Sequence, residues 1–85
     1  MNARSQTING QKLYAIVASL FGLRAEDVND ATSQDTVEQW DSMGTVTLIS
    51  ELEGAFDVEF DLMELVAFRS VGEIRNVLAS RGVQF

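Results

Sequence analysis

The sequence contains no cysteine, no histidine and no proline. Without cysteine the chain has no disulfide and no thiolate nucleophile, and without histidine it lacks the usual general base and the commonest zinc ligand. No apolar run is long enough to cross a bilayer, and the first ten residues lack the apolar core of a secretory signal. These absences predict a non-catalytic, cytoplasmic protein without a membrane span or a metal site.

Basic residues are also scarce, since six of them stand against 13 acidic residues and the net charge is −7. Twelve of the acids lie between Glu26 and Glu64, a stretch without lysine or arginine. An acidic chain repels nucleic acid and anionic lipid and attracts basic protein surfaces. The charge therefore predicts protein partners with basic docking patches and no nucleic acid. A merely solubilising surface remains the alternative.

The chain has 85 residues, 46% of them hydrophobic, which is enough for one modest core and no second lobe. We therefore expect a single domain over residues 1–85, and a monomer. The first residues, up to about residue 8, are expected to form a disordered N-terminus and residues 83–85 a C-terminal tail.

Apolar residues spaced along one helical face predict a first helix over Leu13, Ile16, Val17, Leu20 and Phe21. Gly22 is predicted to end this helix in the left-handed conformation that glycine adopts without strain. Its start is ambiguous, because Ser5, Thr7 and Asn9 are all residue types that cap helices.

Residues from about 23 to 41 show neither helical nor strand periodicity, which predicts a long loop. Val28, Val37 and Trp40 are predicted to anchor this loop onto the helices. A second helix is predicted from Ser42 to about Phe56. Its core side is predicted to hold Thr45, Leu48, Ile49, Leu52 and Phe56.

The last third of the chain is predicted to contain a short helical turn and a final helix. The short turn is predicted over Leu62, Leu65 and Val66. Ser70 and Glu73 form a capping box ahead of the last helix, which Gly82 ends. Its apolar positions are Val71, Ile74, Val77 and Leu78. The predicted fold class is all-α: a small bundle of three longer helices and one short helix, with its long loop between the first two.

Asp41 and Ser42 stand where the second helix begins. Both residue types are favoured as N-caps, so one interpretation is that Ser42 simply caps the helix. A helix start also favours an attached phosphate, because its free N–H groups and dipole attract an anion. Met43 is predicted to face solvent beside Ser42, where it either folds back on the loop or contacts a partner or ligand.

The motif Asp41-Ser42-Met43 resembles that of the acyl carrier protein family, in which the serine at the start of the second helix carries 4'-phosphopantetheine. The run "WDSMGTVTLISELEGAFDVEF" is similar to that family's second helix and following loop, and "FRSVGEIRNVLASRG" to its final helix. The first helix with its "FGL" also fits. The resemblance covers about Gln11 to Gly82.

The resemblance implies a non-catalytic carrier with 4'-phosphopantetheine on Ser42, flanked by Asp41 and Met43. An acyl or aminoacyl group would be held on the arm's thiol as a thioester. The implied partners are a phosphopantetheinyl transferase, an acyl- or aminoacyl-activating ligase, and acyl transferases or synthases. The implied partner-binding residues are Met43, Val46, Thr47, Glu51 and Glu53. Acyl-pocket candidates are Leu48, Leu52, Phe56, Leu65, Phe68 and Ile74, for which a solid core is the alternative.

The second helix has Gly44, Thr47 and Ser50 where carriers of fatty-acid synthesis often have acids. This departure resembles stand-alone carriers of dedicated aminoacyl, acyl or polyketide pathways, and the cargo stays open. The alternative function is an unmodified acidic helical module for protein interaction, with Ser42 as a plain cap.

Overall fold

The computed structural model describes residues 8–85, apart from the side chains of Leu62 and Leu65. It contains three α-helices, α1 (Ile8–Phe21), α2 (Ser42–Phe56) and α3 (Val71–Ser80). Two short 3-10 helices, η2 (Ala25–Asp27) and η3 (Leu62–Ala67), lie in the connections. Within the described residues there is no strand, only an isolated bridge between residues 33 and 70. The all-α class is confirmed.

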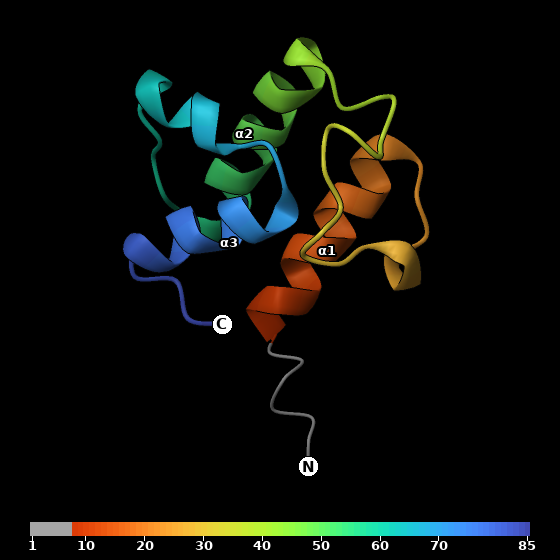
Figure 1. Cartoon of the computed structure of the whole chain (residues 1–85). Coiled ribbons are helices and arrows are strands. Elements are labelled where there is room, and N and C mark those ends of the chain that lie inside the picture. Colours follow the sequence, from red (N-terminus) through yellow and green to blue (C-terminus); the bar gives the residue numbers. More distant parts are fainter. Residues whose placement is uncertain (1–7) are drawn as a thin grey trace.

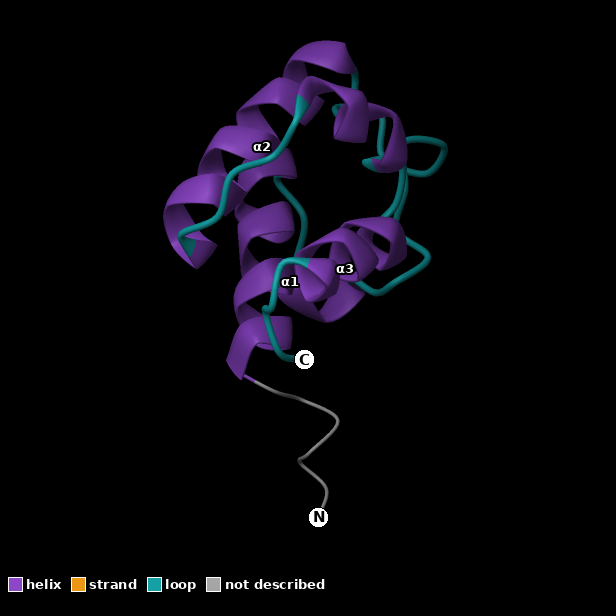
Figure 2. Cartoon of the chain, turned by 90° about the vertical axis from the view of Figure 1, so that its left-hand side faces the viewer, coloured by secondary structure: helices purple, strands orange, loops and turns teal. Residues whose placement is uncertain are grey.

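Helices α1 and α2 lie side by side, and α3 runs across them (Figures 1 and 2). The end of α1 meets the start of α2, because Phe21 packs against the backbone of Gly44. At the opposite end Lys12 donates a hydrogen bond to the carbonyl of Ala55. The two helices are therefore antiparallel. In Figure 1, η3 is the short cyan helix beside the upper part of α2.

Local sequence signals set several helix ends. Gly22 ends α1 with φ of 69°, as predicted. Asp57 ends α2 in the same left-handed region, with φ of 55°. The Ser70 hydroxyl accepts a hydrogen bond from the Glu73 N–H (3.2 Å) and starts α3, as the capping box predicts. The segment predicted as a short helical turn is the 3-10 helix η3.

The described residues are ordered into helix or packed on the bundle up to both ends of the range 8–85. Ile8 belongs to α1 and is not part of a disordered N-terminus, whereas residues 1–7, with the candidate caps Ser5 and Thr7, lie outside the described residues. Asn9 lies in the first turn, and its side-chain amide donates to the carbonyl of Gln84 (2.9 Å). Phe85 is half-buried against Phe56, with ring centroids 6.4 Å apart. The last residues are therefore packed on the bundle.

The core joins all three helices and the long loop. Its fully buried side chains are Leu13, Val17, Leu48, Leu52, Phe68, Val71, Ile74 and Leu78. Val28, Val37 and Trp40 are buried at 5%, 5% and 2% exposure, which confirms them as anchors of the loop. The Trp40 ring stacks on Phe21 with centroids 5.2 Å apart. Burial of these large rings ties the residues before α2 to the end of α1.

Backbone hydrogen bonds also hold the long loop against the start of α3. The N–H groups of Val71 and Gly72 donate to the carbonyls of Thr32 and Asp30 (2.9 and 3.0 Å). The N–H of Gln34 donates to the carbonyl of Arg69 (3.0 Å). These bonds satisfy two free N–H groups of α3 and fix the loop in place.

A cluster of polar and aromatic side chains joins α1, the loop and α3. Arg75 donates to the Tyr14 hydroxyl (2.7 Å) and pairs with the Asp30 carboxylate (2.9 Å), which also accepts from Tyr14. The guanidinium lies over the rings of Tyr14 and Phe85. Burial, followed by the hydrogen bond to Asp30, raises the pKa of Tyr14. We call Tyr14, Asp30, Arg75 and Phe85 the Arg75 clamp.

Candidate functional site

The start of α2 is capped by Asp41. Its Oδ1 accepts a hydrogen bond from the Gly44 N–H (2.8 Å), and its carbonyl accepts from the Thr45 N–H (2.9 Å). Asp41 has the extended backbone of an N-cap, and Ser42 is the first helical residue. The interpretation of Ser42 as the cap is therefore wrong, because the neighbouring carboxylate takes that role.

Ser42 is exposed, and its hydroxyl makes no hydrogen bond to any residue of the described range. It sits in the first turn, where the positive end of the helix dipole favours an attached anion. The hydroxyl is thus accessible to an enzyme that approaches the end of the bundle. The position of Ser42 thus favours an attached phosphate.

A saturated hydrogen-bond network lies beneath Ser42. The Thr45 Oγ1 accepts from the Trp40 indole N–H (3.1 Å) and from the Gln34 side-chain amide (3.3 Å). The same hydroxyl donates to the carbonyl of Asp41 (3.0 Å). A hydroxyl has one hydrogen to donate and two lone pairs, so all its capacity is used. The network fixes the backbone that presents Ser42.

Position 44 requires glycine, because its backbone lies close to the Gln39 carbonyl and the Phe21 ring. A Cβ atom at position 44 would lie 2.8 Å from the carbonyl oxygen of Gln39 and 3.0 Å from a ring carbon of Phe21. No larger side chain fits there without a backbone shift, which explains a glycine in the first turn of a helix.

Four large apolar side chains are exposed on α2 and η3, and two of them, Val46 and Val66, line a groove together with Ser42. Met43 is 72% exposed and Val46 53%, and on η3 Met63 is 83% and Val66 78% exposed. The prediction that Met43 faces solvent is confirmed. We call Met43, Val46, Met63 and Val66 the apolar face. Met63 and Val66 were not predicted, because their position beside α2 depends on how the chain returns after α2.

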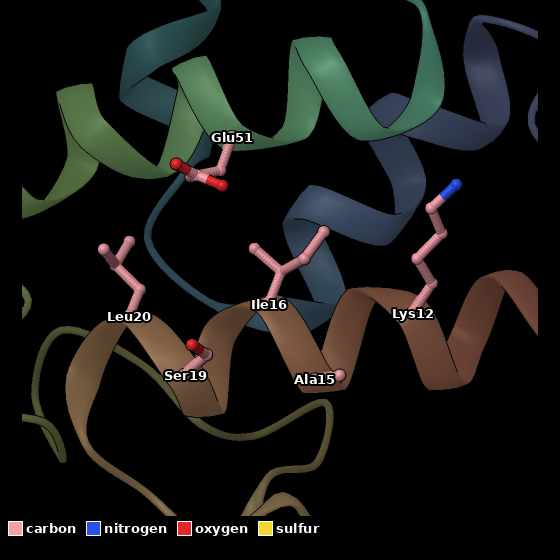
Figure 3. A pocket seen from close by; sticks show the side chains of 6 residues that line it. All are labelled: Lys12, Ala15, Ile16, Ser19, Leu20 and Glu51. Atoms are coloured by element: carbon pink, nitrogen blue, oxygen red, sulfur yellow. The ribbon is translucent and has the colours of Figure 1, made fainter.

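The two predicted acidic partner residues lie on different sides of α2, because Glu53 follows Ser42 by eleven residues, about three full turns, and so lies on the same side as Ser42. Glu51 lines a groove of about 410 Å³ between α1 and α2, with Lys12, Ile16 and Leu20 (Figure 3). Glu51 follows Ser42 by nine residues, about 900° around the helix, and therefore lies on its opposite side. The Glu53 carboxylate accepts a hydrogen bond from the Phe60 N–H (3.0 Å), which fixes it to the following connection. Thr47 is exposed.

The acyl-pocket candidates belong to the packed core. Leu48, Leu52, Phe68 and Ile74 are fully buried, and Phe56 is partly buried against the same cluster. The side chain of Leu65 lies outside the described part. The four buried residues therefore lie inside the core, and their role in holding an acyl chain stays a prediction.

Residues 8–85 bring together no group of three or more carboxylate, histidine or cysteine side chains that could hold a metal ion. None of the helices described is long and apolar enough to cross a membrane.

Comparison of the sequence with known proteins identifies its family. A family model described as "phosphopantetheine attachment site" matches residues 11–78. A search of curated proteins finds no match. Since the family match spans most of the chain and includes Ser42, it confirms the resemblance to acyl carrier proteins. The chain belongs to the phosphopantetheine attachment site family, in which 4'-phosphopantetheine is the covalently bound prosthetic group of a carrier.

Proposed function

We propose that Ser42 is the attachment point and that the arm carries an acyl or aminoacyl thioester between partner enzymes. The observation that carries this proposal is the exposed, unpaired hydroxyl of Ser42 in the first turn of α2. Asp41 holds the turn by capping it, so Ser42 is free to be modified. The sequence has no cysteine, and the arm supplies the thiol that a thioester needs.

The loading reaction requires a separate transferase with coenzyme A as the donor. The Ser42 Oγ attacks the phosphorus that bears the pantetheine, and the new O–P bond forms as the pyrophosphate P–O bond breaks. Adenosine 3',5'-bisphosphate leaves, and the hydroxyl proton passes to a base. We assign this base to the transferase, because the chain has no histidine and the neighbouring Asp41 carboxylate is held by the Gly44 N–H as the helix cap.

Partner enzymes are proposed to dock on the apolar face, together with Thr47 and with Glu53, which lies on the same side of α2 as Ser42. Exposed methionine and valine side chains around a modification site provide an apolar contact area. The net charge of −7 attracts basic partners over a distance and raises encounter rates at low salt. Short-range contact is therefore apolar and long-range attraction electrostatic. Glu51 contacts only those partner enzymes that also extend to the α1 side of α2.

Storage of a long acyl chain inside the bundle would require the core to open. Leu48, Leu52, Phe68 and Ile74 have no exposed surface, and close-packed cores resist insertion. We propose that the cargo stays outside this core. A short acyl or aminoacyl group fits that arrangement, and the loading ligase selects it.

The test is the intact mass of the protein after incubation with coenzyme A and a broad-specificity phosphopantetheinyl transferase. The parent is expected to gain one phosphopantetheine and Ser42→Ala none. Ser50→Ala, which changes an exposed serine on the same helix, is the matched control and is expected to load as the parent does. Loading of Ser42→Ala would disprove attachment at Ser42. A folded parent that gains no mass would instead favour the unmodified interaction module.

A further inference from the structure

One arginine, which directly follows α3, holds the start of η3. The Arg81 guanidinium donates one hydrogen bond to the Glu59 carbonyl (3.0 Å) and another to the Glu64 carboxylate, with which it forms an ion pair. It also lies over the Phe60 ring, 5.9 Å from the ring centroid. In Figure 1 the connection after α2 passes the end of α3 on its way to η3. Arg81 therefore bonds to residues on both sides of the point where η3 begins.

Glu64 links this arginine to the first turn of η3. Its Oε1 accepts from the Asp61 N–H (2.9 Å) as well as from Arg81, and its own N–H donates to the Asp61 carbonyl (2.9 Å). The other side-chain bond nearby, from the Phe60 N–H to Glu53, is made before η3 begins. The start of η3 thus depends on the pair of Arg81 and Glu64.

The rest of η3 has few attachments of its own. Phe68, directly after η3, is fully buried and anchors its far end in the core. Between the two ends, Met63 and Val66 are exposed. Among the η3 side chains that the structure describes, only Glu64 forms an ion pair. A 3-10 helix is seldom longer than about four residues, because its hydrogen bonds have poor geometry, whereas η3 has six residues. Its near end therefore relies on Arg81.

We propose that Arg81 is a positioning residue for partner docking, because it holds η3 where Met63 and Val66 join the apolar face. The inference rests on the proposed docking at that face and goes beyond it, since it assigns the geometry of the face to a residue outside it. Ser42 begins α2, whereas Arg81 bonds to the connection that leaves the other end of that helix. Arg81 thus acts on docking through η3 and not by contact with the partner.

Without Arg81, η3 should leave this position for part of the time. Elements with few buried contacts open locally at a lower free energy than the whole domain. If the positioned fraction falls to about one third, a partner that binds only the positioned state shows an apparent dissociation constant about threefold higher. The rate at saturation should stay unchanged, because the bound partner holds η3 in place and Asp41 still caps the turn that carries Ser42.

The test measures loading of Arg81→Met and of the parent by a broad-specificity phosphopantetheinyl transferase with coenzyme A. The KM for the carrier is expected to rise about threefold at unchanged kcat. The Glu64 N–H, which bonds to the Asp61 carbonyl, is expected to exchange with solvent severalfold faster. Arg81→Lys keeps the charge but lacks the planar fork of the guanidinium, and should give an intermediate KM.

Arg75→Met is the matched control. Arg75 is another arginine that pairs with an acid and lies over aromatic rings, and none of its bonds reaches η3. It is expected to keep the KM of the parent. The same rise in Arg75→Met as in Arg81→Met would show a general loss of stability and would overturn the positioning role. A parent-like KM in folded Arg81→Met would also overturn it and would leave docking on the apolar face standing.

A double-mutant cycle tests whether Arg81 acts through η3. Met63→Ser combined with Val66→Ser is expected to raise the KM, and Arg81→Met is expected to add no further rise in that protein. A full additional rise would show that Arg81 contacts the transferase directly and would overturn the proposal. An unchanged KM in the protein with both serines would overturn docking on η3 together with the positioning role, whereas attachment at Ser42 is decided separately by mass.

Discussion

The apolar face around Ser42 and the Arg75 clamp are built in opposite ways. On the apolar face, methionine and valine side chains are exposed and the Ser42 hydroxyl has no partner among the described residues. In the clamp, charged and polar groups bond to one another and two aromatic rings cover the guanidinium. The comparison teaches that the polar groups at the start of α2 bond beneath a surface that stays apolar and open, whereas those of the clamp bond to one another under aromatic rings.

The largest expected loss of stability comes from a substitution of Trp40, which is buried just before the start of α2. Trp40→Ala removes a side chain with 2% exposure and its stacking on Phe21, and we expect a loss of about 3–5 kcal/mol in the free energy of unfolding. Urea denaturation measures this. Trp40→Phe keeps an aromatic ring but loses the bond to Thr45 and should cost less. An equal loss in both variants would make that hydrogen bond, rather than the buried ring, the main contribution.

Gly44 and Gly54 offer a matched pair on α2. Gly44→Ala places a Cβ 2.8 Å from the Gln39 carbonyl, and we expect a loss of about 1–3 kcal/mol. Gly54→Ala meets no atom within 4 Å and should stabilise the helix by up to about 1 kcal/mol. The same urea titration distinguishes them. If both substitutions changed the free energy of unfolding in the same direction, the close approach of the Gln39 carbonyl would not be the reason for glycine at position 44.

Arg75 tests whether the clamp serves stability alone. Arg75→Met removes the bonds to Tyr14 and Asp30, and we expect a loss of about 1–2 kcal/mol with an unchanged rate of loading at Ser42. Arg69→Met, at an exposed arginine, makes the same change of charge and is expected to cost less than about 0.5 kcal/mol. A slower loading reaction in the folded Arg75→Met protein would contradict the separation of the two regions.

Glu64 gives a smaller effect that depends on pH. Its hydrogen bond from Arg81, and then that from the Asp61 N–H, lower the pKa of Glu64. A lowered folded-state pKa stabilises the protein above the unfolded value of about 4.3 and stops doing so as pH falls through the folded value. The difference in urea midpoint between the parent and Glu64→Gln should therefore narrow on acidification below about pH 4. In Arg81→Met the Glu64 pKa should move back toward its ordinary value, and an unmoved value would exclude Arg81 as the cause.

Met43 should show almost no effect on stability. Met43→Ala removes a side chain that is 72% exposed, and the free energy of unfolding should change by less than about 0.5 kcal/mol. The kcat/KM of the transferase should nevertheless fall about fivefold or more, as expected of a central interface contact worth about 1 kcal/mol. Ile8 is another exposed apolar residue. An equal fall in the kcat/KM of the transferase with Ile8→Ala would argue against a specific docking role for Met43.

Local signals made much of the fold predictable from the sequence. Gly22 and the Ser70 capping box set their helix ends without reference to the rest of the chain. The contacts that place the loop against α3 were not predictable, because backbone groups of residues 30–34 carry them whatever the side chains. The sequence could not decide whether Asp41 or Ser42 is the N-cap of α2, since both residue types are favoured at that position. The groove at Val66 depends on the return of η3 to α2, which no local pattern specifies.

The proximity of Asn9 and Gln84 has a practical consequence for engineering this carrier. Both residues lie at the end of the bundle where α2 finishes, about 20 Å from its first turn. A fusion partner, an immobilisation tag or a short segment that closes the chain on itself could be joined there without covering Ser42. A permuted chain reopened elsewhere would leave the first turn of α2 intact and would show whether the connection between the ends limits how fast the domain folds.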